Sequence, residues 1–164
     1  MMERFQKIIS VYSYGLGCGL YNRNQVIKLC DDLIETKDNV PIEIIETSLM
    51  AKSKIEDIEH TLMSAIHQLD IEKMASYILG LLYKRLTLEG FSVEYVIKCT
   101  SKILLHTGLC HDSKFYSLYS IEDSYNLCIK GVFFQLDDIC QELHSELENY
   151  EIYEQEFNNL LWTK

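Results

Sequence analysis

The chain has 164 residues, of which 48% are hydrophobic, and a formal net charge of −10 at pH 7. This length and apolar content exclude a disordered chain and predict one domain spanning residues 1–164. No apolar run approaches the roughly 20 residues that a membrane-spanning helix needs. Excess carboxylates also disfavour binding to nucleic acid or anionic lipid, whose phosphates repel them. We therefore expect a cytoplasmic protein.

Apolar residues recur with helical spacing along almost the whole chain, which contains a single proline. The spacing predicts an all-α fold, a compact bundle of about eight or nine helices, with stacked helical hairpins as a second arrangement. Apolar stripes fall at residues 5–12, 26–33, 44–49, 55–69, 74–82 and 93–104, and further helices are expected at 120–131, 136–150 and 151–162.

Several predicted helices begin with side chains that accept hydrogen bonds from free backbone amides. Ser53 and Glu56 have the spacing of a capping box, in which each side chain bonds the other residue's amide. Pro41 suits the first position of the third helix, where no amide hydrogen is needed. The other candidate N-caps are Asn22, Asn24, Asp70 and Ser92.

Glycines and irregular segments divide these helices. The glycine-rich residues 15–19 lack the spacing of a nucleotide-binding loop, and we interpret them as a flexible turn that ends the first helix at Gly15. Gly90, Gly108 and Gly131 are expected to end later helices. Residues 109–119 show no clear period and are predicted to form a loop, and residues 132–134 a short extended link.

The six cysteines include no C-x-x-C pair. Several lie on the apolar faces of predicted helices, where a reduced cysteine packs as a small hydrophobic residue. A disulfide framework is not expected in a chain of this size and apolar content. The cysteines are Cys18, Cys30, Cys99, Cys110, Cys128 and Cys140.

Two groups of residues resemble parts of catalytic or metal sites. Asp57 and His60 are one helical turn apart, as in di-iron bundles, and His67 would extend the same helix face. However, the second pair that such a site needs is missing. Cys110 and His111 are adjacent, whereas a thiol–imidazole dyad usually joins separate elements. We therefore predict no catalytic residue, no metal and no cofactor.

The charge is concentrated near the end of the chain. Residues 121–164 contain ten acidic and two basic side chains, a net of −8. On a wheel of the helix predicted at 136–150, Asp138, Glu142 and Glu146 form one stripe, opposite an apolar arc about 100° wide. The stripe fits a solvated face that keeps the protein soluble, or a docking face for a basic partner.

The segment before this helix is rich in tyrosine and acid. Tyr116, Tyr119, Asp123 and Tyr125 fall within eleven residues, 115–125. Tyrosine gives a large contact area at low entropic cost and is enriched at binding hot spots. These residues are therefore candidate partner contacts beside the acidic stripe, although rings of this kind also cover a protein core.

Several segments resemble a family of small, mostly helical bacterial proteins of undetermined biochemistry. The resemblance covers most of the chain, through residues 14–16, 26–27, 31–34, 41, 44–49, 81–86, 116–127, 131 and 136–139. The family includes candidate immunity proteins of polymorphic toxin systems, which implies stoichiometric inhibition of a toxin and supplies no catalytic residues. The acidic stripe and the cysteines are not part of the family pattern.

Three hypotheses about function follow. The first is a non-enzymatic binding protein, an immunity protein that neutralises a basic toxin by covering its substrate-binding surface. The second is a helical scaffold or regulatory module whose partner docks elsewhere. The third, which we rank last, is a small enzyme or metal protein that uses His60, His67 or the Cys110–His111 pair. The sequence does not indicate an oligomeric state.

Overall fold

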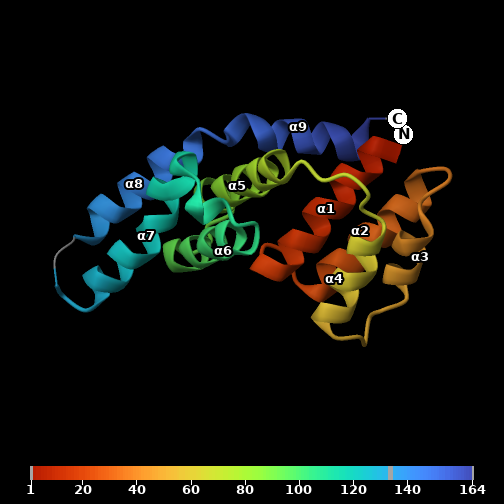
Figure 1. Cartoon of the computed structure of the whole chain (residues 1–164), viewed down its shortest axis with the longest axis horizontal. Coiled ribbons are helices and arrows are strands. Elements are labelled where there is room, and N and C mark those ends of the chain that lie inside the picture. Colours follow the sequence, from red (N-terminus) through yellow and green to blue (C-terminus); the bar gives the residue numbers. More distant parts are fainter. Residues whose placement is uncertain (1, 133–134, 164) are drawn as a thin grey trace. The chain divides into compact units, whose positions relative to one another are not determined.

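The computed structural model describes residues 2–132 and 135–163. These residues form nine α-helices and one 3-10 helix, η1, and contain no strand, which confirms the predicted all-α fold. In chain order the elements in Figure 1 are α1 (Met2–Cys18), α2 (Arg23–Thr36), α3 (Ile42–Ser48), α4 (Ile55–Ser64), α5 (Ile71–Thr87), α6 (Val93–His106), η1 (Leu109–His111), α7 (Ser113–Ile129), α8 (Leu136–Glu148) and α9 (Glu151–Trp162).

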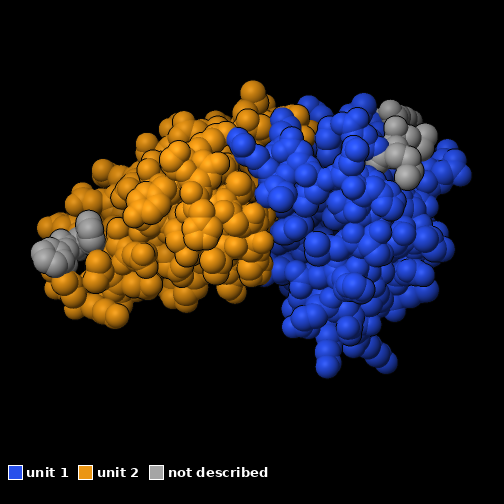
Figure 2. Space-filling model, viewed as in Figure 1, with its two compact units in different colours: residues 1–74, 157–164 blue, residues 75–156 orange. Residues whose placement is uncertain are grey.

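The helices gather into two compact units, coloured separately in Figure 2. Unit 1 contains the residues up to Met74 together with those from Phe157 onward, and unit 2 runs from Ala75 to Glu156. The unit boundaries fall inside α5 and α9. The single domain expected from the sequence remains a prediction.

Helix α1 forms the centre of unit 1. Every residue from position 8 to position 13 is buried, so α1 is covered on all sides rather than along one stripe. Two buried serines satisfy their hydroxyls on backbone oxygens: Ser10 donates to Lys7 at 2.8 Å and Ser13 to Glu59 of α4 at 3.3 Å. Helix α4 packs against α1, and α3 contacts both α2 and α4.

In unit 2, α7 packs against both α6 and α8, and the first turn of α9 crosses α5 at very short range. Gly80 makes this crossing possible. A Cβ at this position would lie 2.5 Å from the carbonyl oxygen of Tyr150 and 2.7 Å from the amide nitrogen of Glu154. Only glycine leaves room for backbone atoms at that distance.

Several local predictions are confirmed. Asn22 and Gln25 form a capping box at the start of α2, and Ser92 accepts the amide of Tyr95 at the start of α6. Asp70 accepts the amide of Lys73 at 2.9 Å. The last two predicted helices are present as α8 and α9, and Gly90, Gly108 and Gly131 all have positive φ angles just after helix ends.

The prediction that α1 ends at Gly15 is wrong, because the helix continues to Cys18 and the chain turns at Gly19, where φ is 89°. Gly15 has a packing role instead. The ring of Tyr21 folds back so closely that a Cβ at Gly15 would lie 2.7 Å from it. Residues 15–18 are therefore helical and not a flexible turn.

The loop predicted at 109–119 is also wrong. Residues 109–111 form η1, and α7 begins at Ser113 instead of near Ser120. The carboxylate of Asp112 caps α7 by accepting the amide of Lys114 at 2.8 Å. Phe115, Leu118 and Ile121 then bury one face of the helix.

Errors in unit 1 concern α3 and α4. The capping box at Ser53 does not form, because Lys54 occupies the N-cap position without a side-chain bond, and α4 ends at Ser64 rather than near 69. Pro41 is the N-cap of α3, one position earlier than expected. Of the three apolar residues expected to face inward here, Ile44 is buried and Ile45 is exposed, and Leu49, just after the end of α3, is exposed as well.

No helix in the described ranges is both long enough and apolar enough to cross a bilayer. The extended link predicted at 132–134 includes residues 133 and 134, which lie outside the described residues.

Candidate functional site

Helix α8 carries the acidic stripe, and its apolar face is well packed. Ile139, Leu143 and Leu147 are buried at successive helical turns, as the sequence pattern predicts. Asp137 and Asp138 occupy the first turn, where the positive end of the helix dipole favours carboxylates. Burial of one face thus holds the opposite face of α8 toward solvent.

The three stripe residues do not share one environment. Asp138 and Glu142 are exposed, whereas Glu146 is half-buried. At 100° per residue, the i, i+4 spacing shifts each successive stripe residue by about 40°, toward the packed side of the helix. Asp138 and Glu142 are therefore the more accessible pair for a partner.

Within the described part of the chain, no lysine or arginine forms an ion pair with the stripe. The ion pairs of unit 2 use other carboxylates: Lys84 binds Glu154 at 2.9 Å, and Lys98 binds Glu94 at 2.6 Å. Residues 75–156 contain thirteen acidic and six basic side chains, a net charge of −7, which leaves −3 for the rest of the chain. Unit 2 therefore carries most of the negative charge, and α8 presents it without an internal counter-charge.

Two groups on and beside α8 have raised pKa values, mainly because they are buried. Burial raises the pKa of the Cys140 thiol, and the nearby carboxylate of Asp137 raises it further. Burial, with the charges of Glu148 and Glu151, raises the pKa of Tyr83. Burial alone raises the pKa of an acid, and the nearby carboxylates add a smaller contribution of the same sign.

The candidate residues on α7 fall into two groups. Tyr116, Tyr119 and Asp123 lie within roughly 60° of one another on the helix wheel. Tyr116 is 64% exposed, Asp123 is exposed and Tyr119 is half-buried. These three residues, which we call the α7 outer face, lie on the more exposed side of α7, whereas Phe115, Leu118 and Ile121 are buried.

Tyr125 lies on the other side of α7. Its side chain is half-buried, and its pKa is raised first by burial and then by Glu94 of α6. Cys140 of α8 adds a smaller contribution with the same sign. Tyr125 thus faces neighbouring helices rather than the solvent beside Tyr116.

Helices α7 and α8 pack as antiparallel neighbours in unit 2 (Figure 1). The Phe115 ring near the start of α7 stacks on Tyr150, just after α8, with ring centroids 6.3 Å apart. The beginning of α7 therefore lies beside the end of α8, and Tyr116 lies toward the Glu146 end of the stripe. The structure brings the two candidate sets onto neighbouring helices of one unit.

The candidate catalytic and metal residues do not assemble. Across residues 2–132 and 135–163, no group of three or more His, Cys, Asp or Glu side chains has the geometry of a metal site. His60 and His67 do not share a helix face, because α4 ends at Ser64. Cys110 is buried while His111 is exposed. The metal and thiol arrangements drawn from the sequence therefore have no geometric support.

The sequence patterns did not reveal two features of the structure. On α8, His144 packs edge-on against the Tyr83 ring of α5, with centroids 5.2 Å apart. In unit 1, a cavity of about 210 Å³ opens beside α1, lined by Phe5, Gln6, Ile9, Asn39, Pro41, Glu43, Ala65 and His67. Because these residues come from separate helices and loops, no local spacing indicates the cavity.

Comparisons of the chain with known protein families, curated proteins and solved structures found no match.

Proposed function

We propose that this protein is a non-enzymatic binding protein that captures a basic protein partner on unit 2. The contacts would come from Asp138, Glu142 and Glu146 of α8, with Tyr116 of the α7 outer face as an aromatic anchor. The partner would be a toxin domain whose cationic substrate-binding surface is covered in the complex. This role is that of an immunity protein, which the family resemblance implies.

The observation that carries the proposal is the exposed pair Asp138 and Glu142, which has no counter-charge in the described structure. Like charges at i, i+4 each destabilise a helix by roughly 0.2–0.5 kcal/mol. Glu146 and Glu148 also lie near the end of α8, where the helix dipole disfavours carboxylates. Lysine at these positions would favour the isolated helix, whereas carboxylates favour a complex with a cationic surface.

A toxin that acts on nucleic acid would suit the acidic stripe for a chemical reason. Enzymes that act on nucleic acid usually present a basic surface to the phosphates. A carboxylate stripe competes for that surface and accelerates encounter through long-range attraction. The exposed ring of Tyr116, at the Glu146 end of the stripe, supplies the aromatic contact that charged pairs alone lack.

The test uses the product of the neighbouring reading frame as the candidate toxin. Association would be followed at about 50 and 300 mM NaCl, a range over which the Debye length falls by more than half. The triple variant Asp138→Lys, Glu142→Lys, Glu146→Lys should reduce the association rate constant at low salt by about tenfold or more. The same variant should lose neutralisation of the toxin while keeping its helical circular dichroism.

A matched control reverses three exposed acids of unit 1, Glu35, Asp38 and Glu46, with the same change in net charge. This control should retain most of the association rate. Equal losses in both triple variants would point to net charge alone and contradict the site. A partner that binds the α8 variant at the original rate would favour a helical scaffold that docks elsewhere.

A further inference from the structure

Helix α3 and the residue that follows it present an apolar face to solvent in unit 1. Ile42, Ile45 and Leu49 have the i, i+3, i+7 spacing of one helix face, and their side chains are 60%, 38% and 81% exposed. Apolar residues exposed singly are common, whereas contiguous apolar patches mark interaction sites. On the other side of α3, Ile44 and Thr47 are buried. The helix is therefore held with its apolar face outward.

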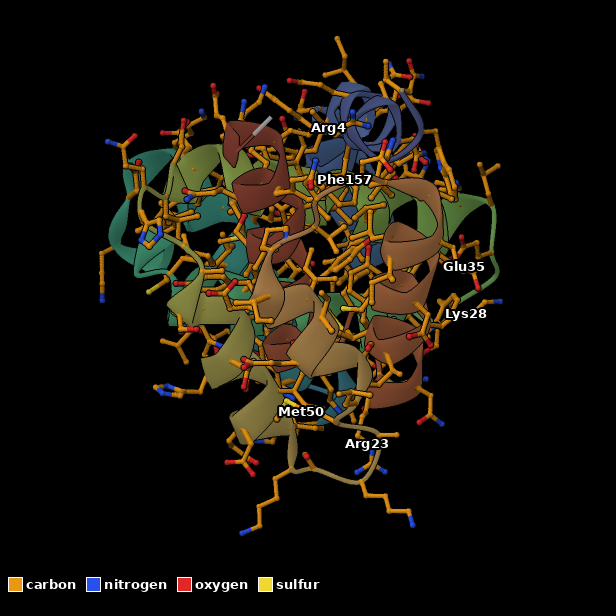
Figure 3. The ribbon with its side chains drawn as sticks, turned by 90° about the vertical axis from the view of Figure 1, so that its right-hand side faces the viewer. Arg4, Arg23, Lys28, Glu35, Met50 and Phe157 are labelled. Carbon is orange, nitrogen blue, oxygen red and sulfur yellow. The ribbon has the colours of Figure 1, made fainter. Side chains whose placement is uncertain are left out.

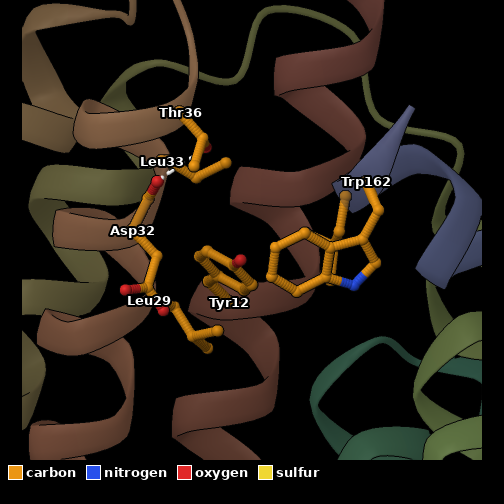
Figure 4. A pocket seen from close by; sticks show the side chains of 7 residues that line it. Tyr12, Leu29, Asp32, Leu33, Thr36 and Trp162 are labelled. Atoms are coloured by element: carbon orange, nitrogen blue, oxygen red, sulfur yellow. Dashed lines mark hydrogen bonds between the residues drawn. The ribbon is translucent and has the colours of Figure 1, made fainter. Parts of the chain in front are cut away.

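Helices α2 and α3 form an antiparallel hairpin, because only residues 37–41 separate two helices that contact each other. Arg23, at the start of α2, donates to the carbonyl oxygen of Ser53 at 2.9 Å. This bond holds the end of α3 beside the beginning of α2, as Figure 3 shows for Arg23 and Met50. The inner side of α2 faces α1 and α9, where Asp32 lines a small hollow (Figure 4). Asp32 therefore does not belong to the outer surface of the hairpin.

Exposed charges of opposite sign occupy the two ends of this hairpin. Lys52 and Lys54 follow α3, at the end where α2 begins. Glu35 and Asp38 lie at the other end, where the chain passes from α2 to α3. Lys37 lies nearby, but it donates to the backbone carbonyl oxygen just after α9, at 2.7 Å. The surface around α3 is therefore basic at one end and acidic at the other.

We infer that this face pairs with the same face of a second copy of the chain, in a two-fold symmetric dimer. Asp38 lies four residues before α3 and Lys52 four residues after it, so the two charges are placed evenly about Ile45. In an antiparallel pair of α3 helices, Ile45 would lie at the symmetry axis, and Ile42 would pack near Leu49 of the second copy. Each Asp38 would meet Lys52 of the second copy, which gives the self-complementarity that a two-fold interface requires.

The dimer is expected to be weak. One short helix and its flanks would bury less than the roughly 1,600 Å² of a standard interface. Glu46 is exposed beside the apolar face, and its two copies would repel each other near the axis. We therefore expect a dissociation constant on the order of 10–100 µM. Kinetic tests of the α8 stripe at much lower concentrations would concern the monomer.

Sedimentation velocity of the full chain, from about 5 to 500 µM, measures this equilibrium. The average sedimentation coefficient should rise with concentration toward that of a dimer. Leu49→Lys, Lys52→Glu and Asp38→Lys should each weaken association by about tenfold or more. Lys102→Glu makes the same charge change at an exposed position of unit 2 and should leave association unchanged. Circular dichroism identifies the variants that remain folded.

Mixing two variants tests the symmetric pairing directly. Lys52→Glu alone, or Asp38→Lys alone, brings like charges together at both contacts of the dimer. An equimolar mixture of these two variants forms opposite-charge pairs at both contacts and should associate about as tightly as the original protein. The double variant should do the same.

Three results would overturn the inference. A chain that remains monomeric up to about 500 µM, well above the expected dissociation constant, would leave the apolar face to a different partner. Folded charge variants that dimerise as tightly as the original protein, or a mixture that recovers no association, would exclude this pairing. Because the face lies in unit 1, the triple variant of the α8 stripe should dimerise normally, so failure of the proposed toxin binding would leave this result unaffected.

Discussion

Replacing Gly80 with alanine tests the closest contact in unit 2. The new methyl carbon would lie 2.5 Å from the carbonyl oxygen of Tyr150 and 2.7 Å from the amide nitrogen of Glu154. Both atoms belong to backbone, which cannot rotate away as a side chain can. The first turn of α9 and the middle of α5 would therefore have to separate by several tenths of an ångström.

Two opposing effects determine how much Gly80→Ala changes the free energy of unfolding. Alanine is favoured over glycine inside a helix by about 1 kcal/mol. Overpacking lowers stability by about 1–3 kcal/mol. Because the new methyl group would meet backbone atoms, which cannot rotate away, we expect a cost near the upper end of this range. The separation also stretches two bonds on the same side of α5, from Tyr77 to Glu156 at 3.1 Å and from Lys84 to Glu154 at 2.9 Å. We expect a net destabilisation of about 2 kcal/mol.

Urea unfolding followed by circular dichroism measures the change in the free energy of unfolding. Ser145→Ala, at an exposed position of α8, serves as a propensity control and should be neutral or slightly stabilising. Tyr77→Phe in the Gly80→Ala background should cost less than in the original protein, because the bond to Glu156 is already strained. A Gly80→Ala protein that is about 1 kcal/mol more stable would refute the close approach.

Two further predictions concern buried groups. Burial raises the pKa of Cys30 from 9.0 to about 12, so above pH 9 the thiol ionises in the unfolded chain before the folded one. Stability should therefore fall by up to about 1.4 kcal/mol per pH unit between pH 9 and 12, and Cys30→Ala should remove this component from unfolding curves measured across that range. Thr100 has a buried hydroxyl with no hydrogen-bond partner among the described residues, so Thr100→Val should raise the free energy of unfolding by about 1 kcal/mol. In a parallel chemical denaturation, Thr107→Val should lower stability, since the Thr107 hydroxyl donates to Ile103 at 2.7 Å; a gain at Thr107 or a loss at Thr100 would contradict this assignment.

Sequence patterns predicted helices best where one side of the helix is polar. Helix α8 illustrates this, since Ile139, Leu143 and Leu147 alternate with carboxylates and all three are buried. Helix α7 shows the opposite case. Its buried face holds Phe115, Leu118 and Ile121, but its exposed residues include Tyr116 and Leu127, so apolar residues surround the helix and no period is visible.

Some features of the candidate site also follow from the sequence, whereas others depend on how the helices pack. The sequence places Asp138, Glu142 and Glu146 on one helix face, because helical spacing depends only on local geometry. It cannot indicate that Glu146 is half-buried or that Tyr125 turns toward α6, because both depend on which neighbouring helix packs there. The cavity beside α1, lined by Phe5, Asn39 and His67 among others, joins distant segments and has no local pattern at all.

The sequence by itself determined the all-α class, the helix caps at Asn22 and Ser92, and the acidic face of α8, since all of these depend on interactions within a few residues. The tertiary structure alone decided the contact at Gly80 and the cavity beside α1. Those features arise where helices far apart in the chain approach one another, and their geometry depends on packing that no short segment encodes.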